Sequence, residues 1–289
     1  MSLIGRLRDS GARFVRTLYE FRMNVICGKP KACNRKERIM RVIAAYIAVV
    51  FIWSTTPLSV KLSVSAGEAF APLVGRTVIG LVISLLCLAF ISAKVNFSPA
   101  AWRVYGSSAL SAVGAMLLTY KAANYLPSGL IAVVYGLSPM ITGLFAVPLL
   151  KESRPGGVQL TGIVLAITGL AVVFGRELRV EGESWIGLVY LLAAVILYGL
   201  STVLVKFFNR GFNALAVNAG SLMIALPFLA LFAGGGSGYQ QVVSDRTAFL
   251  ATLYLGVIGS FVGFVLFFYI LQALSATRVM MIPLITPFL

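Results

Sequence analysis

The segment YLPSGLIAVVYGLSP, residues 125–139, has a counterpart near the other end of the chain, ALSATRVMMIPLITP at residues 273–287. The two segments place Pro139 against Pro287 and share a run of apolar residues between their polar positions. Self-similarity at a fixed offset indicates an internally repeated structure.

A second pair of matching segments lies upstream of the first pair. IWSTTPLSVK at residues 52–61 aligns with LYGLSTVLVK at residues 197–206, so that Trp53 meets Tyr198 and both segments end in lysine. The alternative explanation of these matches is that any two helical hairpins resemble each other in apolar composition. The same order of matches in both halves of the chain favours a repeat.

The composition is that of an integral membrane protein. Hydrophobic residues make up 59% of the chain, the mean hydropathy is +0.95, and only 11% of residues are charged. A soluble domain is about 45–50% apolar and about 25% charged. Apolar runs long enough to cross a bilayer as helices recur along the chain. We predict eight full spans and a partial ninth: 42–61, 70–92, 102–124, 127–150, 157–175, 185–206, 213–233, 248–271 and the fragment 276–289.

These runs show no ten-residue alternation, so they predict a helical bundle and not a closed barrel. A repeat of five spans is odd in number, and its second copy must therefore cross the membrane in the opposite direction. This is the inverted-repeat plan of secondary transporters, with a binding site near the midplane. The predicted all-α fold has a first five-helix repeat at 42–175, an outer linker at 176–184 and a second repeat at 185–289.

The second repeat breaks off within its fourth helix. Residues 276–289 would form a helix of about 21 Å, shorter than the ~30 Å hydrocarbon core. We expect a truncated sequence or gene, so that the counterpart of GVQLTGIVLAITGLAVVFG (157–175) is missing. The alternative is a shorter relative whose last helix is dispensable or supplied by a partner.

Basic residues are concentrated in residues 1–41, which hold eleven of the 24 lysines and arginines. A short basic segment beside a first span stays in the cytoplasm, so the amino terminus is predicted to lie inside. The stretch 3–26 carries apolar residues at helical spacing and predicts a helix lying on the inner leaflet, although Gly11 interrupts it. The net charge of +15 thus indicates contact with anionic lipid and not with nucleic acid.

Several kinds of site lack the residues that they need. The chain has no histidine, and Cys27 and Cys33 fall in the basic tail, while Cys87 lies inside a span. We therefore expect no metal centre and no cofactor. All nine carboxylates lie in the tail, in loops or at predicted helix ends. Proton-coupled carriers usually hold an ionisable residue at mid-depth in the membrane. Because no carboxylate or histidine is predicted at that depth here, the sequence favours facilitated diffusion or exchange.

The chain resembles the drug/metabolite transporter superfamily, in particular its ten-helix EamA-type members, from about residue 42 to the end. The resemblance rests on the W-S-x-x-P and lysine of residues 52–61, on Arg76, and on the block YLPSGLIAVVYGLSPMITGLFAVPLLKE (125–152) with its glycine-rich sequel. It implies two five-helix bundles that face each other around a central cavity and move small metabolites.

Five residues are candidates to line that cavity. Arg76 lies about two turns into the second helix, where a guanidinium would attract an anionic or zwitterionic solute; snorkelling to the outer interface is the alternative. Trp53 and Tyr198 share one repeat position and could wall a site or simply pack. Tyr120 has the same two explanations. Asn218 needs a hydrogen-bond partner, either another helix or a ligand.

Prolines and lysines at helix positions have separate predicted roles. Pro57, Pro139 and Pro287 are hinge candidates, because a proline inside a helix frees a carbonyl and permits a kink. Lys61 and Lys206, at matching helix ends on opposite sides of the membrane, are predicted mainly to anchor their helices at the interface; lining an entrance to the cavity is the alternative.

The sequence therefore predicts a secondary transporter, permease or exporter, that works by alternating access in a plasma membrane, the bacterial inner membrane. Its expected partners are a small solute, anionic or zwitterionic, and the lipid bilayer; a homodimer is an open option. Two alternatives are a non-transporting scaffold or defective fragment, and a membrane enzyme acting on lipid-linked phosphates. Only Glu152 beside Lys151 and Arg154 approaches a catalytic cluster, and a helix end with an ion pair explains that trio.

Overall fold

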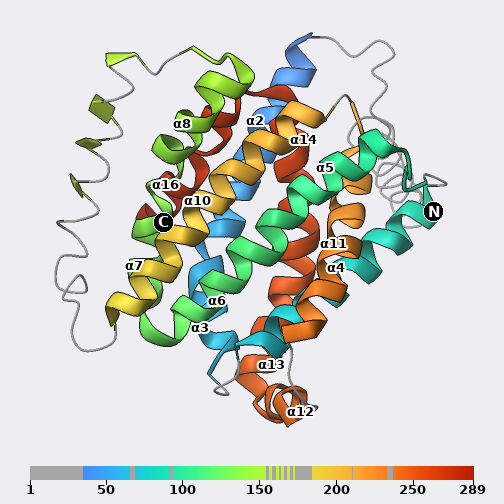
Figure 1. Cartoon of the computed structure of the whole chain (residues 1–289), viewed down its shortest axis with the longest axis vertical. Coiled ribbons are helices and arrows are strands. Elements are labelled where there is room, and N and C mark those ends of the chain that lie inside the picture. The colour runs from blue at the N-terminus through green and yellow to red at the C-terminus, as the bar shows by residue number, and fades with distance from the viewer. Residues whose placement is uncertain are drawn as a thin grey trace, which may run out of the picture.

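The computed structural model describes residues 35–65, 69–91, 94–153, 184–209, 211–232 and 237–289, together with scattered positions between 156 and 172. All regular elements within these ranges are helical (Figure 1). They are α2 (Arg35–Ser54), α3 (Thr56–Ser63), α4 (Phe70–Phe90), α5 (Pro99–Ala109), η2 (Leu110–Ala115), α6 (Met116–Tyr125), α7 (Ser128–Tyr135), α8 (Ser138–Leu150), α10 (Ser184–Phe208), α11 (Ala214–Phe232), α12 (Ser237–Ser244), α13 (Arg246–Tyr254), η3 (Leu255–Gly263), α14 (Phe264–Ala273), α15 (Ala276–Val279), α16 (Ile282–Ile285) and η4 (Thr286–Phe288).

Within the described ranges, six helices are long and apolar enough to cross a membrane: Lys36–Ser63, Phe70–Phe90, Ser128–Leu150, Ser184–Phe208, Ala214–Leu231 and Arg246–Ala273. The predicted third span is also helical, as the consecutive elements α5, η2 and α6, but it is more polar. The predicted fifth span at 157–175 is described only at scattered positions. The predicted interfacial helix and nearly all of the linker lie outside the described residues.

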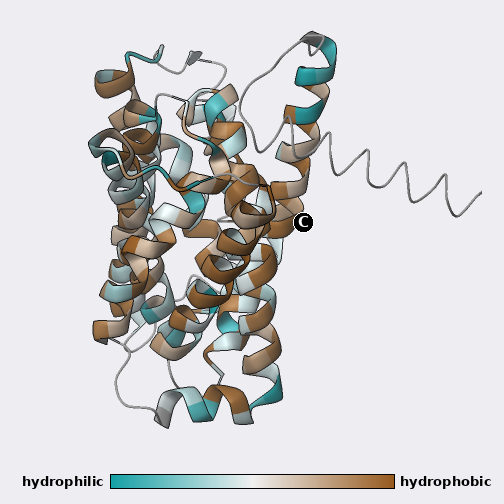
Figure 2. Ribbon diagram, turned by 90° about the vertical axis from the view of Figure 1, so that its right-hand side faces the viewer, coloured by the Kyte–Doolittle hydropathy of each residue, from teal (hydrophilic) through white to brown (hydrophobic). Residues whose placement is uncertain are grey.

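The two halves of the bundle run in opposite directions. Figure 1 shows α2 descending from the top of the view into α3, whereas α10 rises from the bottom of the view. We call the end of the bundle at which α2 begins the inner end, because the sequence predicts that it faces the cytoplasm, and the opposite end the outer end. Hydrophobic residues dominate the length of the long helices (Figure 2).

The helices form two packed units that exchange their first helices. In unit A, α10 of the second half packs against α5, η2, α6 and α8 of the first half. In unit B, α2 of the first half packs against η3, α14, α16 and η4 of the second, and α3 packs against α13. Helices α4 and α11 lie against each other and join the two units. Each unit is therefore built from both halves of the chain.

Two of the helices are broken, and a proline follows each break. Helix α2 ends at Ser54, and Pro57 lies in the first turn of α3. Helix α7 ends at Tyr135, and Pro139 lies in the first turn of α8. Proline is tolerated there because the first-turn N–H groups have no intrahelical partner. Pro287 lies in the short 3₁₀ turn η4. All three hinge candidates thus occupy interruptions of the helical backbone.

Two π-helical stretches occupy corresponding positions in the two halves. At the offset that aligns Pro139 with Pro287, η2 corresponds to residues 258–263, which lie inside η3. The first residue after each stretch is then Met116 in one half and Phe264 in the other. A π-helix adds a residue to the turn and frequently occurs at functional sites. Both stretches end beside the central cavity.

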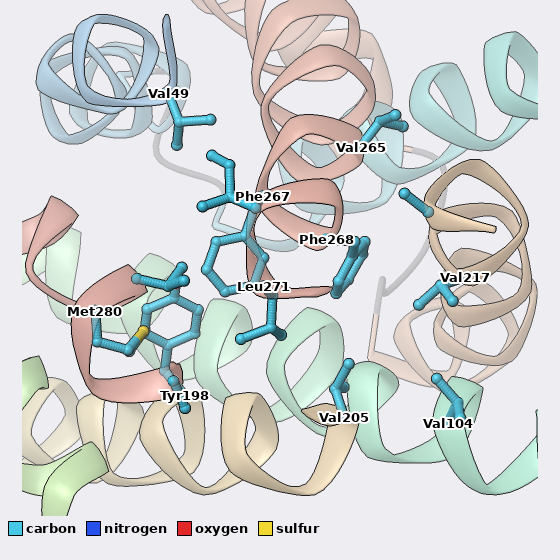
Figure 3. Packing of buried hydrophobic residues seen from close by; sticks show 14 of the residues in the cluster. Val49, Val104, Tyr198, Val205, Val217, Val265, Phe267, Phe268, Leu271 and Met280 are labelled. Carbon is cyan, nitrogen blue, oxygen red and sulfur yellow. The ribbon is translucent and has the colours of Figure 1, made fainter. Parts of the chain in front are cut away.

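The core is formed where the two units meet. The largest buried cluster includes Val49 of α2, Tyr198 of α10 and Phe267 of α14. Figure 3 shows Tyr198, Phe267 and Met280 converging from α10, α14 and the segment between α15 and α16. The Tyr198 and Phe267 rings are stacked with their centroids 6.1 Å apart. Aromatic packing across the boundary of the units therefore surrounds the site described next.

Candidate functional site

A cavity lies between unit A and unit B, with α4 closing one wall. It contains about 620 Å³ of space free of protein atoms, including the part open to solvent, and the centre of a water molecule fits in about 70 Å³. Its walls come from both halves of the chain. The lining residues are Trp53, Thr56, Pro57, Val60, Arg76, Met116, Thr119, Ile131, Ala132, Tyr135, Tyr198, Phe264, Pro283 and Thr286.

The lining follows the internal repeat. Trp53 of α2 and Tyr198 of α10 are aligned in the repeat, and both line the cavity. Met116 and Phe264, which follow the two π stretches, form a second aligned pair on its walls. Since the two halves run in opposite directions, aligned residues approach the same cavity from opposite sides. The cavity thus occupies the centre of the repeat, where transporters with inverted repeats bind their substrates.

Aromatic rings form one wall of the cavity. The Trp53 ring lies edge-on to Tyr198 at 6.1 Å and to Phe264 at 5.8 Å, and Tyr135 lies edge-on to Tyr198 at 5.8 Å. The Tyr135 hydroxyl shares a hydrogen bond of 2.7 Å with Thr119 Oγ1. The Tyr198 hydroxyl is buried and has no hydrogen-bond partner among the described residues. A buried hydroxyl without a partner is costly, so a solute that hydrogen-bonds it would be stabilised.

Arg76 supplies a positive charge to this otherwise apolar cavity. Its side chain is 3% exposed, so it does not snorkel to the surface of the bundle. Its Nε donates a hydrogen bond of 2.8 Å to Ser260 Oγ, and Nη1 donates one of 3.5 Å to the Tyr120 hydroxyl. Tyr120 itself is fully buried and is not among the residues that line the cavity. Both partners of the guanidinium are neutral.

The described part of the chain holds three carboxylates, and none of them pairs with Arg76. Glu37 belongs to the first turn of α2, Glu152 follows α8, and Asp245 caps α13. A buried guanidinium without an acidic partner pays a desolvation cost that a bound anion would offset. The repeat position of Arg76 in the second half is Ser221, so the charge is confined to one side of a nearly symmetric cavity.

Asn218 lies behind the cavity wall. Its Nδ2 donates hydrogen bonds to Ser84 Oγ at 3.0 Å and to the Ser260 carbonyl at 3.1 Å. It is 1% exposed and is not among the lining residues. Asn218 therefore connects α11 to α4 and to η3, and it supports the serine that holds Arg76 in place.

Replacing Asn218 by alanine is expected to destabilise the protein without altering its choice of solute. Interhelical polar contacts in membrane proteins contribute about 0.6 kcal/mol on average, and up to about 1.7 kcal/mol. Asn218→Ala should therefore lower the thermal transition in detergent by a few degrees. Ser221→Ala is the matched control, because its Oγ donates only to the Asn218 carbonyl within the same helix. Equal melting temperatures for the two variants would contradict the assigned bridge.

Several lining residues were not among the sequence candidates. Met116, Thr119, Phe264 and Thr286 come from α6, α14 and η4, and their types alone do not distinguish cavity lining from packing. The internal repeat is the signal that could have identified Met116 and Phe264. Extending the aligned segments upstream pairs Met116 with Phe264, as Trp53 pairs with Tyr198.

These features define a class of protein: a helical membrane protein of two inverted halves with a central cavity, which is the architecture of a secondary transporter. The sequence profile of the EamA-like transporter family matches residues 40–175 and again residues 185–289. The chain therefore belongs to the EamA-like transporter family.

Individual relatives are distant but cover most of the chain. Protein PagO of Salmonella typhimurium is 25% identical over 86% of this chain and 83% of its own length. The uncharacterized transporter YoaV of Bacillus subtilis is 24% identical over 87% and 86%. A probable terminal-alkyne amino-acid exporter of Streptantibioticus cattleyicolor is 23% identical over 82% and 79%. A protein of known crystal structure has a TM-score of 0.68 and 17% identity over 85% of this chain and 84% of its own, which shows a shared fold.

Proposed function

We propose that the protein carries small amphipathic solutes with a carboxylate or similar anionic group across the membrane by alternating access. The observation that carries this proposal is Arg76, a buried guanidinium that lines the central cavity and whose hydrogen bonds within the described part of the chain go to two hydroxyl groups. Family membership supports transport and not catalysis. The predicted location is a bacterial inner membrane with the amino terminus in the cytoplasm.

The chemistry of the cavity supports an anionic head and an apolar body. A guanidinium binds a carboxylate through paired, charge-assisted hydrogen bonds. Trp53, Tyr198 and Phe264 offer ring faces and edges to an apolar body, and the Tyr198 hydroxyl offers a further hydrogen bond. The printed description of the Streptantibioticus relative as an amino-acid exporter is consistent with a carboxylate-bearing solute.

The energy source proposed here is the solute gradient, through facilitated diffusion or exchange. The described helices carry no carboxylate in their middle turns, and the whole chain has no histidine. A proton-coupled carrier usually needs a titratable group at that depth. Transport rates should therefore depend little on an imposed pH gradient.

The direct test is exchange in proteoliposomes that contain the purified full chain. Labelled amino acids and aliphatic or aromatic monocarboxylates are offered beside their uncharged amides and beside organic cations of the same size. We expect saturable exchange of the carboxylates, with the amides transported at least about tenfold more slowly, because loss of a charge-assisted pair costs about 1.5–3 kcal/mol. Selective transport of the cations, or no transport by protein that retains its fold, would contradict the proposal.

Trp53 provides a second test, directed at the apolar part of the solute. Trp53→Ala should raise the KM for an aromatic carboxylate about tenfold, because the ring contributes packing area and edge contacts to the cavity. Trp102→Ala is the control, since Trp102 is also a tryptophan but lies at the surface near the start of α5, 47% exposed. If both variants change KM equally, the aromatic wall is not where the solute binds.

A further inference from the structure

The two repeat-related lysines, Lys61 and Lys206, donate hydrogen bonds to backbone carbonyls of other helices. At the outer end, Lys61 Nζ donates a hydrogen bond of 2.5 Å to the Ala123 carbonyl. At the inner end, Lys206 Nζ donates to the Leu271 carbonyl at 2.8 Å and also to the Leu274 carbonyl. The repeat offset that aligns Pro139 with Pro287 also aligns Ala123 with Leu271. The two contacts are therefore the same contact, made once at each end of the bundle.

Each of these contacts joins unit A to unit B. Lys61 belongs to α3 of unit B, and Ala123 belongs to α6 of unit A. Lys206 belongs to α10 of unit A, and Leu271 belongs to α14 of unit B. The exchange of first helices between the halves is what makes both contacts cross the boundary. A lysine ammonium is also a suitable partner for the last carbonyls of a helix, which have no intrahelical donors.

The inner end has an additional bond between the two halves of the chain. Glu152, which follows α8 of unit A, accepts hydrogen bonds from the Ala276 backbone N–H at 2.7 Å and from Thr277 Oγ1 at 2.9 Å. Both donors lie in α15, the short helix that connects α14 to α16 of unit B and packs against α8 and α10 of unit A. Lys151, immediately before it, adopts a left-handed backbone with φ 52° that ends α8. Lys206 and Glu152 thus both contribute charged contacts between the two halves at the inner end.

We propose that Lys61 and Lys206 are equivalent gate residues, Lys61 holding the two units together at the outer end and Lys206, with Glu152, at the inner end. This inference rests on the proposed alternating access. Lysine contacts therefore bridge the two units at both ends in this structure. Opening to one side requires the units to separate at that end, which breaks one lysine contact and leaves the other intact.

If the two lysines are gate residues, removing each one should favour opening to a different side of the membrane. Losing the Lys61 contact should favour opening outward, and losing the Lys206 contact should favour opening inward. A ligand or mutation shifts a two-state equilibrium only by its different effect on the two states. Two lysines that simply stabilised the bundle would lower its stability and leave the balance between the two openings unchanged.

The experiment measures access to one cysteine in the cavity from each side. Thr56→Cys is introduced into the full chain after Cys27, Cys33 and Cys87 are replaced by serine, and sided vesicles are labelled with a membrane-impermeant maleimide. In this background, Lys61→Met should raise the ratio of outer to inner labelling rates about tenfold, and Lys206→Met should lower it about tenfold, as expected for loss of a charge-assisted hydrogen bond. Glu152→Gln should act in the same direction as Lys206→Met but more weakly.

Two controls separate gating from loss of structure. Lys121→Met removes another lysine of the outer end, whose ammonium lies 5.6 Å from the Phe70 ring centroid and 5.7 Å from that of Tyr190, and it should leave the ratio unchanged. Lys61→Arg and Lys206→Arg keep a cationic donor and should restore most of the parental ratio. A lysine variant that does not fold is detected by size-exclusion chromatography, and the Glu152→Gln and arginine variants then still report the direction.

The outcomes distinguish this inference from the proposed function. If the parent cysteine is labelled from both sides, but neither methionine variant changes the ratio, or both change it in the same direction, the gate assignment is overturned and alternating access stands. If the parent cysteine is labelled from one side only, with and without solute, alternating access itself fails and the gate assignment fails with it.

Discussion

Arg76→Met is expected to reduce exchange of carboxylate solutes about a hundredfold, the largest functional effect that the structure predicts. Removing one partner of a buried, hydrogen-bonded charge pair costs about 2–5 kcal/mol of binding, and 2.7 kcal/mol corresponds to a factor of one hundred. The guanidinium is 3% exposed and lines the cavity, so water cannot replace it easily. The measurement is the exchange rate in proteoliposomes at matched protein content.

The stability of the same variant shows whether the loss is functional. A buried charge without an ionic partner lowers the stability of the folded state. Replacing it by an apolar side chain of similar length is therefore often neutral or stabilising. We therefore expect Arg76→Met to melt at the parental temperature or above it while transport falls. Arg76→Lys should retain part of the activity, because it keeps the charge but loses the planar pair of donors.

Arg103→Met is the matched control, because Arg103 is exposed near the start of α5. It should transport at the parental rate. The proposed role of Arg76 would be wrong if Arg76→Met also exchanged carboxylates at the parental rate. The guanidinium would then serve only to connect α4 to η3 through Ser260.

Gly220→Ala is expected to give the largest loss of stability among single-methyl changes in the described helices. A Cβ at this position of α11 would lie 2.5–2.6 Å from three ring atoms of Tyr105 in α5, closer than side chains can approach. Tyr105 is 1% exposed, and its hydroxyl accepts a hydrogen bond from the Asn96 N–H, so the ring has little room to move. Overpacking of this kind costs about 1–3 kcal/mol, or a melting temperature lower by about 2–10 °C.

Gly143→Ala is the control for Gly220→Ala. Gly143 also lies inside a helix, α8, but a Cβ there would meet nothing within 4 Å among the described residues. The intrinsic helix preference for alanine should then leave the melting temperature unchanged or slightly higher. Thermal unfolding in detergent, followed by circular dichroism, checks both variants. Equal transitions would show that α5 and α11 can move apart at no cost.

Much of the architecture was predictable from the sequence because it depends on local properties. The length and hydropathy of each apolar run are sufficient to predict a spanning helix, since a bilayer demands internal hydrogen bonding of the backbone. The repeat could also be read from aligned segments, which place Trp53 and Tyr198 at equivalent positions. The two rings lie 6.1 Å apart at the cavity. An inverted repeat brings its equivalent midpoints to one place, which is why this pair could be recognised without coordinates.

A helical membrane protein with two related halves could thus be recognised from hydropathy and self-similarity, which are properties of the residues alone. Which helix faces meet depends instead on packing between segments far apart in the chain. The sequence was compatible with Arg76 pointing outward to the interface and with Asn218 facing the cavity. In the folded bundle, Arg76 is buried in the cavity wall and Asn218 lies behind that wall. Lys61 and Lys206 each donate a hydrogen bond to a carbonyl of the other unit, a contact that the sequence did not predict. That contact exists only because the first helix of each half packs into the opposite unit, a choice made by interactions between distant segments.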